Sequence, residues 1–375
     1  MLALQAAKRK QQTDCNALAE AHGFCHLAPI MSDTPALTPT PHKRRPRYSG
    51  RNPRRFEDKY KEHANDPETL AKVLAAGKTP AGTHRPIMVG EILAALDPQP
   101  GHLAADGTLG FGGHSSELLK RITPGGRLLG LDADPIELPK TEARLRAAGF
   151  GPDVFTAHRS NFAGLPQVLA ANQLSSVDLI LADLGVSSMQ IDDPQRGFSV
   201  KLSGPLDMRM NPQRGQPASA WLKNIKPAAL AEVLTENADE PHSDTLAAAL
   251  AGKSFARTLE LAAAIRAALP ASKAEDVDLS VRRVFQALRI AVNDEFSALE
   301  TFLRHVPTCL SPGGRVAILT FHSGEDRRVK KAFQAGERAG IYAEVAHDVI
   351  RPSAEELHAN PRSAPAKLRW ARKAD

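Results

Sequence analysis

The sequence predicts an α/β fold whose mostly parallel sheet is interrupted by an all-helical insert. Three short apolar runs each end in an aspartate, at Asp106, Asp132 and Asp183. Helical patterns separate these runs, and strands that alternate with helices are typical of parallel βαβ units. An Ala- and Leu-rich stretch without a convincing strand follows over residues 215–280, and an apolar run returns at residues 316–321. We therefore expect a Rossmann-like sheet that is discontinuous in the sequence.

The first predicted strand leads directly into a glycine-rich loop. Residues 103–105 are apolar, residues 106–115 read DGTLGFGGHS, and Leu118, Leu119 and Ile122 begin a helical pattern. Glycine adopts positive φ and has no side chain, so the backbone of such a loop can approach a ligand closely. The helix start behind the loop offers free N–H groups. The same glycines are also compatible with a tight turn that binds nothing.

The second and third strands narrow the choice of ligand. Residues 126–132 end in Asp132, 26 positions after Asp106, which is roughly where nucleotide-binding units place the carboxylate that binds a ribose. A turn or cap before Pro135 is the alternative role for this acid. Residues 177–183 end in a third acid at the same sheet edge. The loop matches no dinucleotide or P-loop pattern and no lysine follows its glycines, so a cofactor with a ribose and no phosphate, S-adenosylmethionine, fits best.

The second half of the chain is expected to be helical before it returns to the sheet. Apolar residues recur at helical spacing in the insert, for example at Leu261, Ile265 and Leu269. Residues 284–310 predict one long amphipathic helix, and Ser311–Gly314 predicts a turn before the returning strand. We expect four regions: a disordered basic extension (1–83), a first part of the sheet domain (84–200), a helical insert (201–283) and a second part of the sheet domain (284–375).

Positive charge is concentrated in the N-terminal extension. Residues 1–84 hold 14 of the 48 Lys and Arg residues and 8 of the 42 Asp and Glu residues, which leaves 34 of each sign for the rest of the chain. Residues 43–55 combine seven basic residues with prolines and no acid, a composition that predicts disorder. This extension could bind RNA phosphates by counterion release, or it could be a solvated tail. The protein could also begin at Met31, so that residues 1–30 would be a wrongly assigned upstream extension. The alternative interpretation of these residues is a targeting peptide.

Composition excludes several classes of protein. No apolar run approaches the roughly 18 residues that a membrane helix needs. The three cysteines, Cys15, Cys25 and Cys309, are too few for a disulfide framework and lack metal-ligand spacing. We therefore expect a protein of the reducing cytoplasm that binds no metal and no membrane. The sequence leaves the oligomeric state open, with a homodimer as one possibility.

Longer blocks of the sequence resemble one known family. They run in order from His84 toward the C-terminus and read HRPIMVGE, DGTLGFGGHS, LADLGVSS, DDPQRGFS, GPLDMRM, FQALRIAVN, FHSGEDR and NPR. Together they resemble the ribosomal RNA small subunit methyltransferase H family, also called MraW. The resemblance implies a class I S-adenosylmethionine-dependent methyltransferase that modifies N4 of a cytidine in small-subunit (16S) ribosomal RNA near the decoding site. The target nucleotide would have to leave its stack to reach the cofactor.

The resemblance also implies roles for single residues. The implied cofactor-binding residues are Gly112, Gly113, His114, Asp132, Phe162, Asp183 and Gln190. Asp132 would bind the ribose and Phe162 would lie beside the adenine. From its place at the end of the third strand, Asp183 could also be the catalytic residue, as the acceptor of an amine N–H, although the resemblance favours contact with the cofactor alone.

Further polar residues of these blocks have two possible roles each. His322, Glu325 and Asp326 follow the returning strand and could line the cytidine pocket or cap a helix. Asp207, Arg209 and Asn293 could contact RNA, although structural roles are favoured. The DPPY-type motif of many amino-methyltransferases is absent, and LGVS (residues 184–187) stands in its place. This motif position therefore offers no aromatic residue to stack on the target base.

The chain departs from the family pattern in four places. Leu109 and Phe111 stand in the glycine loop, Ala133 stands where an arginine is common, Gly324 stands in FHSGED where the family has FHSLED, and residues 238–247 lack the usual basic residues. The last change bears on RNA contacts of the insert rather than on cofactor binding. Three alternatives remain: a nicotinamide dehydrogenase, an RNA-binding assembly factor that kept the fold without activity, and a methyltransferase for another base or a protein amine.

Overall fold

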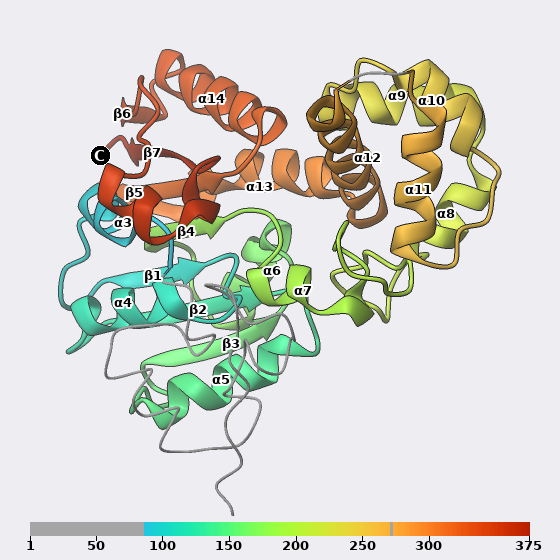
Figure 1. Cartoon of the computed structure of the whole chain (residues 1–375). Coiled ribbons are helices and arrows are strands. Elements are labelled where there is room, and N and C mark those ends of the chain that lie inside the picture. The colour runs from blue at the N-terminus through green and yellow to red at the C-terminus, as the bar shows by residue number, and fades with distance from the viewer. Residues whose placement is uncertain (1–85, 271–272) are drawn as a thin grey trace, which may run out of the picture. The chain divides into compact units, whose positions relative to one another are not determined.

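A seven-stranded sheet forms the centre of the computed structural model, which describes residues 86–270 and 273–375 (Figure 1). The expected basic extension, residues 1–83, lies outside the described residues. The strand order is β3-β2-β1-β4-β5-β7-β6. The strands are β1 (Leu103–Asp106), β2 (Arg127–Asp132), β3 (Phe155–Arg159), β4 (Val177–Asp183), β5 (Leu310–Thr320), β6 (Tyr342–Val345) and β7 (Lys367–Lys373).

The order of the strands confirms the predicted Rossmann-like class I fold. Strands β3, β2, β1, β4 and β5 pair in parallel, whereas β7 runs antiparallel between β5 and β6. The strand order reverses between β1 and β4, and ligands of open α/β sheets bind at such a switch point, outside the carboxyl ends of the strands. Asp106, Asp132 and Asp183 end β1, β2 and β4, as predicted.

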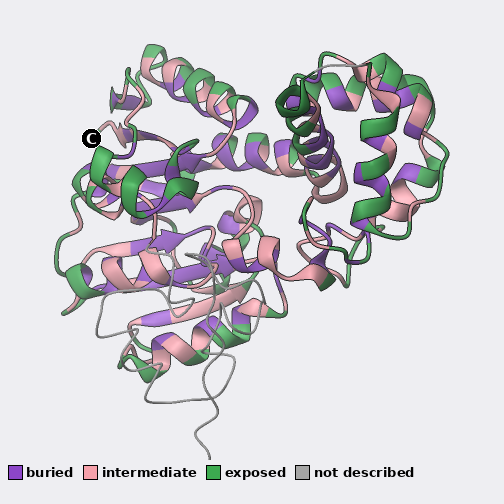
Figure 2. Cartoon of the chain, viewed as in Figure 1, coloured by how far each residue is buried: buried purple, intermediate pink, exposed green. Residues whose placement is uncertain are grey.

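Helices cover both faces of the sheet, and each face has its own core. One core takes apolar residues from α6 (Leu165–Ala171), α13 (Glu295–Cys309) and α14 (Ser323–Arg338). The other takes them from α3 (Val89–Leu96), α4 (Gly113–Ile122) and α5 (Glu137–Ala147). Figure 2 shows strands that are largely buried and helices whose outer faces are exposed. Successive strand residues point to opposite faces, so Ala104 and Ala105 of β1 belong to different cores.

The insert is all-helical and has a third core. Its helices are α8 (Ala218–Asn224), α9 (Pro227–Ala238), α10 (Ser243–Leu250), α11 (Thr258–Ala268) and α12 (Ala274–Asn293). In α12 the buried residues Val281, Val284, Phe285 and Leu288 recur every three or four positions, which places them on one helix face. The third core extends from Phe198 to Leu288, and the boundaries of the four expected regions stay a prediction.

The prediction of one helix over residues 284–310 is wrong. Helix α12 ends at Asn293, Asp294 takes the left-handed conformation with φ 51°, and α13 begins at Glu295. Aspartate tolerates this conformation better than most residues, and the apolar pattern continues on both sides of the break. The predicted turn at Ser311–Gly314 lies inside β5, where the pairing with β4 shifts register as in a β-bulge.

The structure also contains short helices near the site, α7 (Ser188–Asp192) and α15 (Ala354–Ala359). Within residues 86–270 and 273–375, no helix is both long enough and apolar enough to span a membrane. In the same ranges, no group of three or more His, Cys, Asp or Glu side chains is arranged to hold a metal ion.

Candidate functional site

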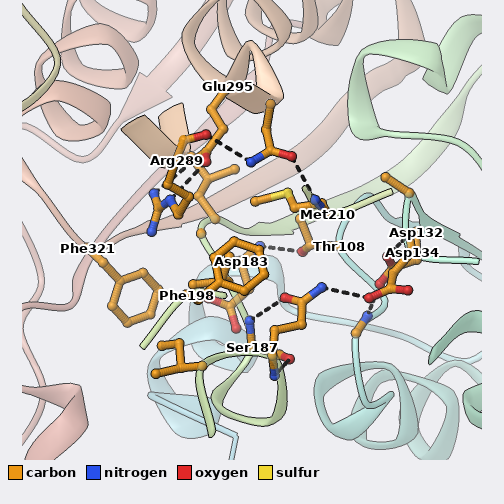
Figure 3. A pocket seen from close by; sticks show the side chains of 18 of the residues that line it. Thr108, Asp132, Asp134, Asp183, Ser187, Phe198, Met210, Arg289, Glu295 and Phe321 are labelled. Atoms are coloured by element: carbon orange, nitrogen blue, oxygen red, sulfur yellow. Dashed lines mark hydrogen bonds and ion pairs between the residues drawn. The ribbon is translucent and has the colours of Figure 1, made fainter. Parts of the chain in front are cut away.

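A cavity of about 1370 Å³ opens at the carboxyl ends of β1, β2 and β4 (Figure 3). One part is lined by the glycine loop and by the segments that follow β2 and β4. The other part is lined by the 198–215 segment and by residues of α12 and α13. Small-molecule sites typically measure about 300–1,000 Å³. The cavity therefore has room for a nucleoside cofactor together with a second nucleotide.

Asp106 fixes the conformation of the glycine loop. Its side chain is 1% exposed, and its two carboxylate oxygens accept hydrogen bonds from the Thr108 backbone N–H (3.0 Å) and from the Ser115 hydroxyl (2.7 Å). Burial raises the pKa of Asp106 above its usual value, although these hydrogen bonds oppose the shift. Gly112 has φ 78°, and a Cβ there would lie 2.9 Å from Cγ2 of Thr141. The loop thus requires glycine at this position for conformation and for space.

Asp132 lies at the edge of the cavity, where a ribose acid is expected. Its Oδ2 accepts the backbone N–H of Gly110 (2.7 Å), and its Oδ1 accepts that of Asp134 (2.8 Å). Burial raises the pKa of Asp132 to about 6, despite these two hydrogen bonds. Each carboxylate oxygen has a second lone pair, so the side chain can still accept hydroxyl groups of a ligand.

His114 and Asp183 face each other across the switch point. Nε2 of His114 donates to the carbonyl oxygen of Ile87 (2.9 Å), and its Nδ1 lies 3.5 Å from Oδ2 of Asp183. The backbone N–H of Asp183 donates to Oγ1 of Thr108 (2.6 Å). Burial raises the pKa of Asp183 to about 6, and His114 opposes that shift. Oδ1 of Asp183 is buried without a hydrogen-bond partner among the described residues.

Phe162 and Gln190, the other two implied cofactor residues, also line the cavity, and their contacts within the protein differ. Phe162 packs edge-to-face on Phe302, with ring centroids 5.3 Å apart. Gln190 has its amide engaged, because Nε2 donates to Oδ2 of Asp134 (2.8 Å) and Oε1 accepts the backbone N–H of Ser187 (2.9 Å). Gln190 therefore braces the wall of the cavity through contacts within the protein.

One departure from the family pattern in the loop has a structural partner. The guanidinium of Arg144 in α5 lies 3.5 Å from the centroid of the Phe111 ring, a cation–π geometry. Leu109 is 3% exposed and packs in the core that includes α4 and α5. Both residues also line the cavity, so they shape its wall as well as stabilising the loop.

A buried ion pair that the sequence did not reveal joins the two parts of the cavity. Nη1 of Arg196 donates to Oδ2 of Asp134 at 2.7 Å, and the two side chains are 9% and 1% exposed. Nη2 of Arg196 donates to the carbonyl oxygens of Arg209 (3.2 Å) and Met210 (2.9 Å). Asp134 follows β2, and Arg196 precedes the insert. Arg196 stands in the DDPQRGFS block, but nothing in the sequence linked it to Asp134.

Asn293, Asp207 and Arg209 have structural contacts, as the favoured reading predicted. Oδ1 of Asn293 accepts the Met210 backbone N–H (2.7 Å), and its Nδ2 donates to the carbonyl oxygen of Met208 (2.8 Å). Nε and Nη2 of Arg209 donate to the two carboxylate oxygens of Asp207 at 2.8 and 2.7 Å. These contacts hold the GPLDMRM segment against the end of α12.

A second buried pair was also missed. Nε and Nη2 of Arg289 donate to the two carboxylate oxygens of Glu295, each at 2.8 Å, across the break between α12 and α13 (Figure 3). Both residues line the cavity. Both residues lie in the predicted amphipathic stretch 284–310, where nothing distinguished them from its other polar residues.

Of the three residues after β5, His322 and Glu325 each take one of the predicted positions and Asp326 takes neither. Glu325 lines the cavity, whereas His322 is the N-cap residue of α14. Burial alone would raise the pKa of Glu325, but the neighbouring His322 and Arg289 hold it below its usual value. Asp326 instead pairs with Arg369 of β7, whose Nε donates to Oδ1 at 2.6 Å.

The residues present fit S-adenosylmethionine. A glycine loop allows close approach of its amino-acid end, Asp132 can accept ribose hydroxyls, and the unpartnered Oδ1 of Asp183 can accept a donor from a ligand. The roles of the single residues in binding it remain proposals.

Comparisons with known proteins agree with this geometry. Residues 81–374 match the model of the MraW methylase family. The ribosomal RNA small subunit methyltransferase H 1 of Lachnoclostridium phytofermentans is 47% identical over 344 residues, which cover 89% of this chain and 93% of the relative. The methyltransferase H 2 of Alkaliphilus metalliredigens is 48% identical, with 88% of this chain and 98% of the relative covered. The ribosomal RNA small subunit methyltransferase H of Anaeromyxobacter sp. is 41% identical, with 76% and 96% covered. The chain therefore belongs to the MraW methylase family.

Proposed function

We propose that this chain methylates N4 of a cytidine in small-subunit ribosomal RNA, near the decoding site, with S-adenosylmethionine as methyl donor. The observation that carries the proposal is the cavity, which extends from a nucleoside-type glycine loop to the 198–215 segment and to residues of α12 and α13. The similarity to the named methyltransferases supports the substrate. A ribosomal substrate supports the expected cytoplasmic location.

The cofactor is proposed to occupy the part of the cavity next to the glycine loop. Gly112 and Gly113 would admit its amino-acid end, His114 would close the turn, and Asp132 would bind its ribose. Phe162 would lie against the adenine, where its ring is already fixed by Phe302. When bound, the cofactor supplies an electrophilic methyl group on a sulfonium.

Asp183 is proposed to activate the amine of the target. The N4 lone pair of cytosine is delocalised into the ring, so the amine is a weak nucleophile. A carboxylate that accepts an N4–H bond returns electron density to nitrogen and orients the amine. Oδ1 of Asp183 suits this role because it is buried and has no hydrogen-bond partner among the described residues. Without a ligand, the raised pKa of Asp183 shows how poorly its charge is compensated.

RNA is proposed to reach the site over a basic rim. Lys201, Arg214 and Arg282 line the cavity and are exposed, and none forms an ion pair in the described part of the chain. Such residues suit phosphate contacts that position the strand. None of residues 238–247, which lack the family's basic residues, lines the cavity.

The test is methyl transfer from tritiated S-adenosylmethionine to small ribosomal subunits, or ribosomal RNA, that lack the modification. Nucleoside mass spectrometry then identifies the product. N4-methylcytidine is the expected result. Another methylated nucleoside would replace the target, and the absence of any product with intact cofactor binding would favour an RNA-binding role without catalysis.

A further inference from the structure

Arg289 presents one free edge of its guanidinium to the cavity. Nε and Nη2 are held by Glu295, and the two side chains are only 15% and 12% exposed. Nη1 has no acceptor within hydrogen-bond distance among the residues that the structure describes. The bidentate pair fixes the plane of the guanidinium, so the direction in which Nη1 donates is set before any ligand binds.

An aromatic ring stands beside this edge, in front of the end of β4. A Cβ placed on Gly185 would lie 4.0 Å from Nη1 of Arg289 and 4.0 Å from Cδ2 of Phe321. Gly185 follows Asp183 by two positions, and Figure 3 shows Asp183, Arg289 and Phe321 around the same part of the cavity. A flat ring could therefore stack on Phe321 with polar groups of its edge near Asp183 and Arg289.

The charges around Arg289 favour a neutral ligand over a phosphate. Glu295 balances the guanidinium directly, and the buried carboxylate of Glu325 is close enough to interact with it electrostatically. An anion at this point would meet two carboxylates. The hydrogen-bonding edge of a base carries no net charge and avoids that repulsion.

These groups are complementary to one base. The Watson–Crick edge of cytosine presents a donor at N4 next to acceptors at N3 and O2, whereas uracil presents an acceptor at O4 and a donor at N3. We propose that Arg289 reads the target base by donating from Nη1 to the N3/O2 acceptors of cytosine, while Oδ1 of Asp183 accepts from N4. Glu295 is a positioning residue that holds the guanidinium. This proposal rests on the proposed function and deepens it.

The test pairs a substrate change with a residue change. Target RNA is prepared with cytidine, 3-deazacytidine or 2-thiocytidine at the modified position, which removes the N3 acceptor or weakens the O2 acceptor. In the wild-type protein at least one analogue should lower kcat/KM about tenfold or more. Arg289→Lys keeps a positive charge beside Glu295 but lacks the planar guanidinium. In this variant the same analogue should lower kcat/KM by less than about twofold. The same comparison is made by RNA binding with S-adenosylhomocysteine present, so that one readout does not depend on catalysis.

The outcomes separate this proposal from the function on which it rests. Failure of the wild type to form N4-methylcytidine from cytidine RNA would refute the proposed function. Normal product with equal analogue penalties in wild type and Arg289→Lys would refute the role of Arg289 alone. Unchanged cofactor affinity and thermal unfolding are required of the variant. If Arg289→Lys does not fold, the double variant Arg289→Met/Glu295→Met replaces it, because a buried pair exchanged for apolar residues is often tolerated.

Discussion

Asp183→Asn should make the ligand-free protein more stable and at the same time inactive. In the folded protein, burial holds the pKa of Asp183 at about 6, against its ordinary value of 3.8. The folded state therefore binds this proton more tightly than the unfolded state. Between these two pKa values the unfolded chain loses the proton first, so the native carboxylate lowers stability as pH rises from about 4 to about 6. Above that range the penalty is constant.

The size of the effect follows from the same difference. Each pKa unit corresponds to about 1.4 kcal/mol, so a rise from 3.8 to about 6 gives a ceiling of about 3 kcal/mol. The side chain is 28% exposed, and the water that reaches it offsets part of this penalty. We expect the asparagine variant to gain about 1–2 kcal/mol at pH 8, or roughly 2–4 °C in the thermal midpoint, and to gain nothing at pH 4.

The assay is thermal unfolding without cofactor at pH 4 and pH 8, beside the methyl-transfer assay. Asp326→Asn is the matched control, since burial alone would raise the pKa of Asp326 but Arg369 and Lys367 hold it below its usual value. That variant should lose stability at pH 8. A stability change for Asp183→Asn that is the same at both pH values, or a loss at pH 8, would refute the idea that Asp183 is an uncompensated buried carboxylate.

Three further variants test the cavity wall and its support, since Asp132 lines the cavity whereas Gly112 and Arg196 do not. Gly112→Ala places a Cβ 2.9 Å from Thr141 at φ 78° and should cost about 1–3 kcal/mol in unfolding free energy and weaken cofactor affinity by calorimetry; an unchanged affinity would mean that the loop yields without effect. Arg196→Met leaves Asp134 buried without its cation and should cost about 3–5 kcal/mol in urea unfolding, so a cost below about 1 kcal/mol would show that the pair is dispensable. Asp132→Ala should abolish or strongly weaken S-adenosylmethionine binding. The affinity of the wild type should rise from pH 5 to pH 7, because the carboxyl group of Asp132, with its pKa of about 6, ionises over this range. An affinity independent of pH would contradict a role for its charge.

The centre of the sheet was predictable from the sequence, and its edges were not. Strands β1, β2 and β4 are apolar runs that end in an acid, so composition alone indicates them. Strands β3 and β6 lie at the two edges of the sheet, and only the first residue of β3 is buried. Strand β7 reads KLRWARK, and its buried Arg369 is neutralised by Asp326. A charge that is buried with its partner looks exposed in the sequence, which hides such a strand.

The site divides in the same way. Local spacing was sufficient for the glycine loop, Asp132 and Asp183, because each follows directly from a strand end. The pair Asp134–Arg196 joins residues 62 positions apart, and no local pattern reports such a contact. Gln190 was expected to bind cofactor because of its place in a family-like block, but hydrogen bonds within the protein already engage its amide.

The carboxyl groups in and behind the cavity wall differ in how their charge is compensated. Asp134 has a buried arginine, and Glu325 has a neighbouring histidine and arginine that lower its pKa. Asp106 has a raised pKa but holds only its own loop and does not line the cavity. Asp132 and Asp183 line the cavity, have pKa values of about 6 and have no Lys or Arg partner within the described ranges. Hydrogen-bond donors of a ligand would stabilise the charge of these two carboxylates, which no Lys or Arg side chain does in the described part of the chain. Ligand binding and carboxylate ionisation should therefore be linked. Two poorly compensated carboxylates at a cavity wall lower stability, so their presence is more readily explained by function than by folding.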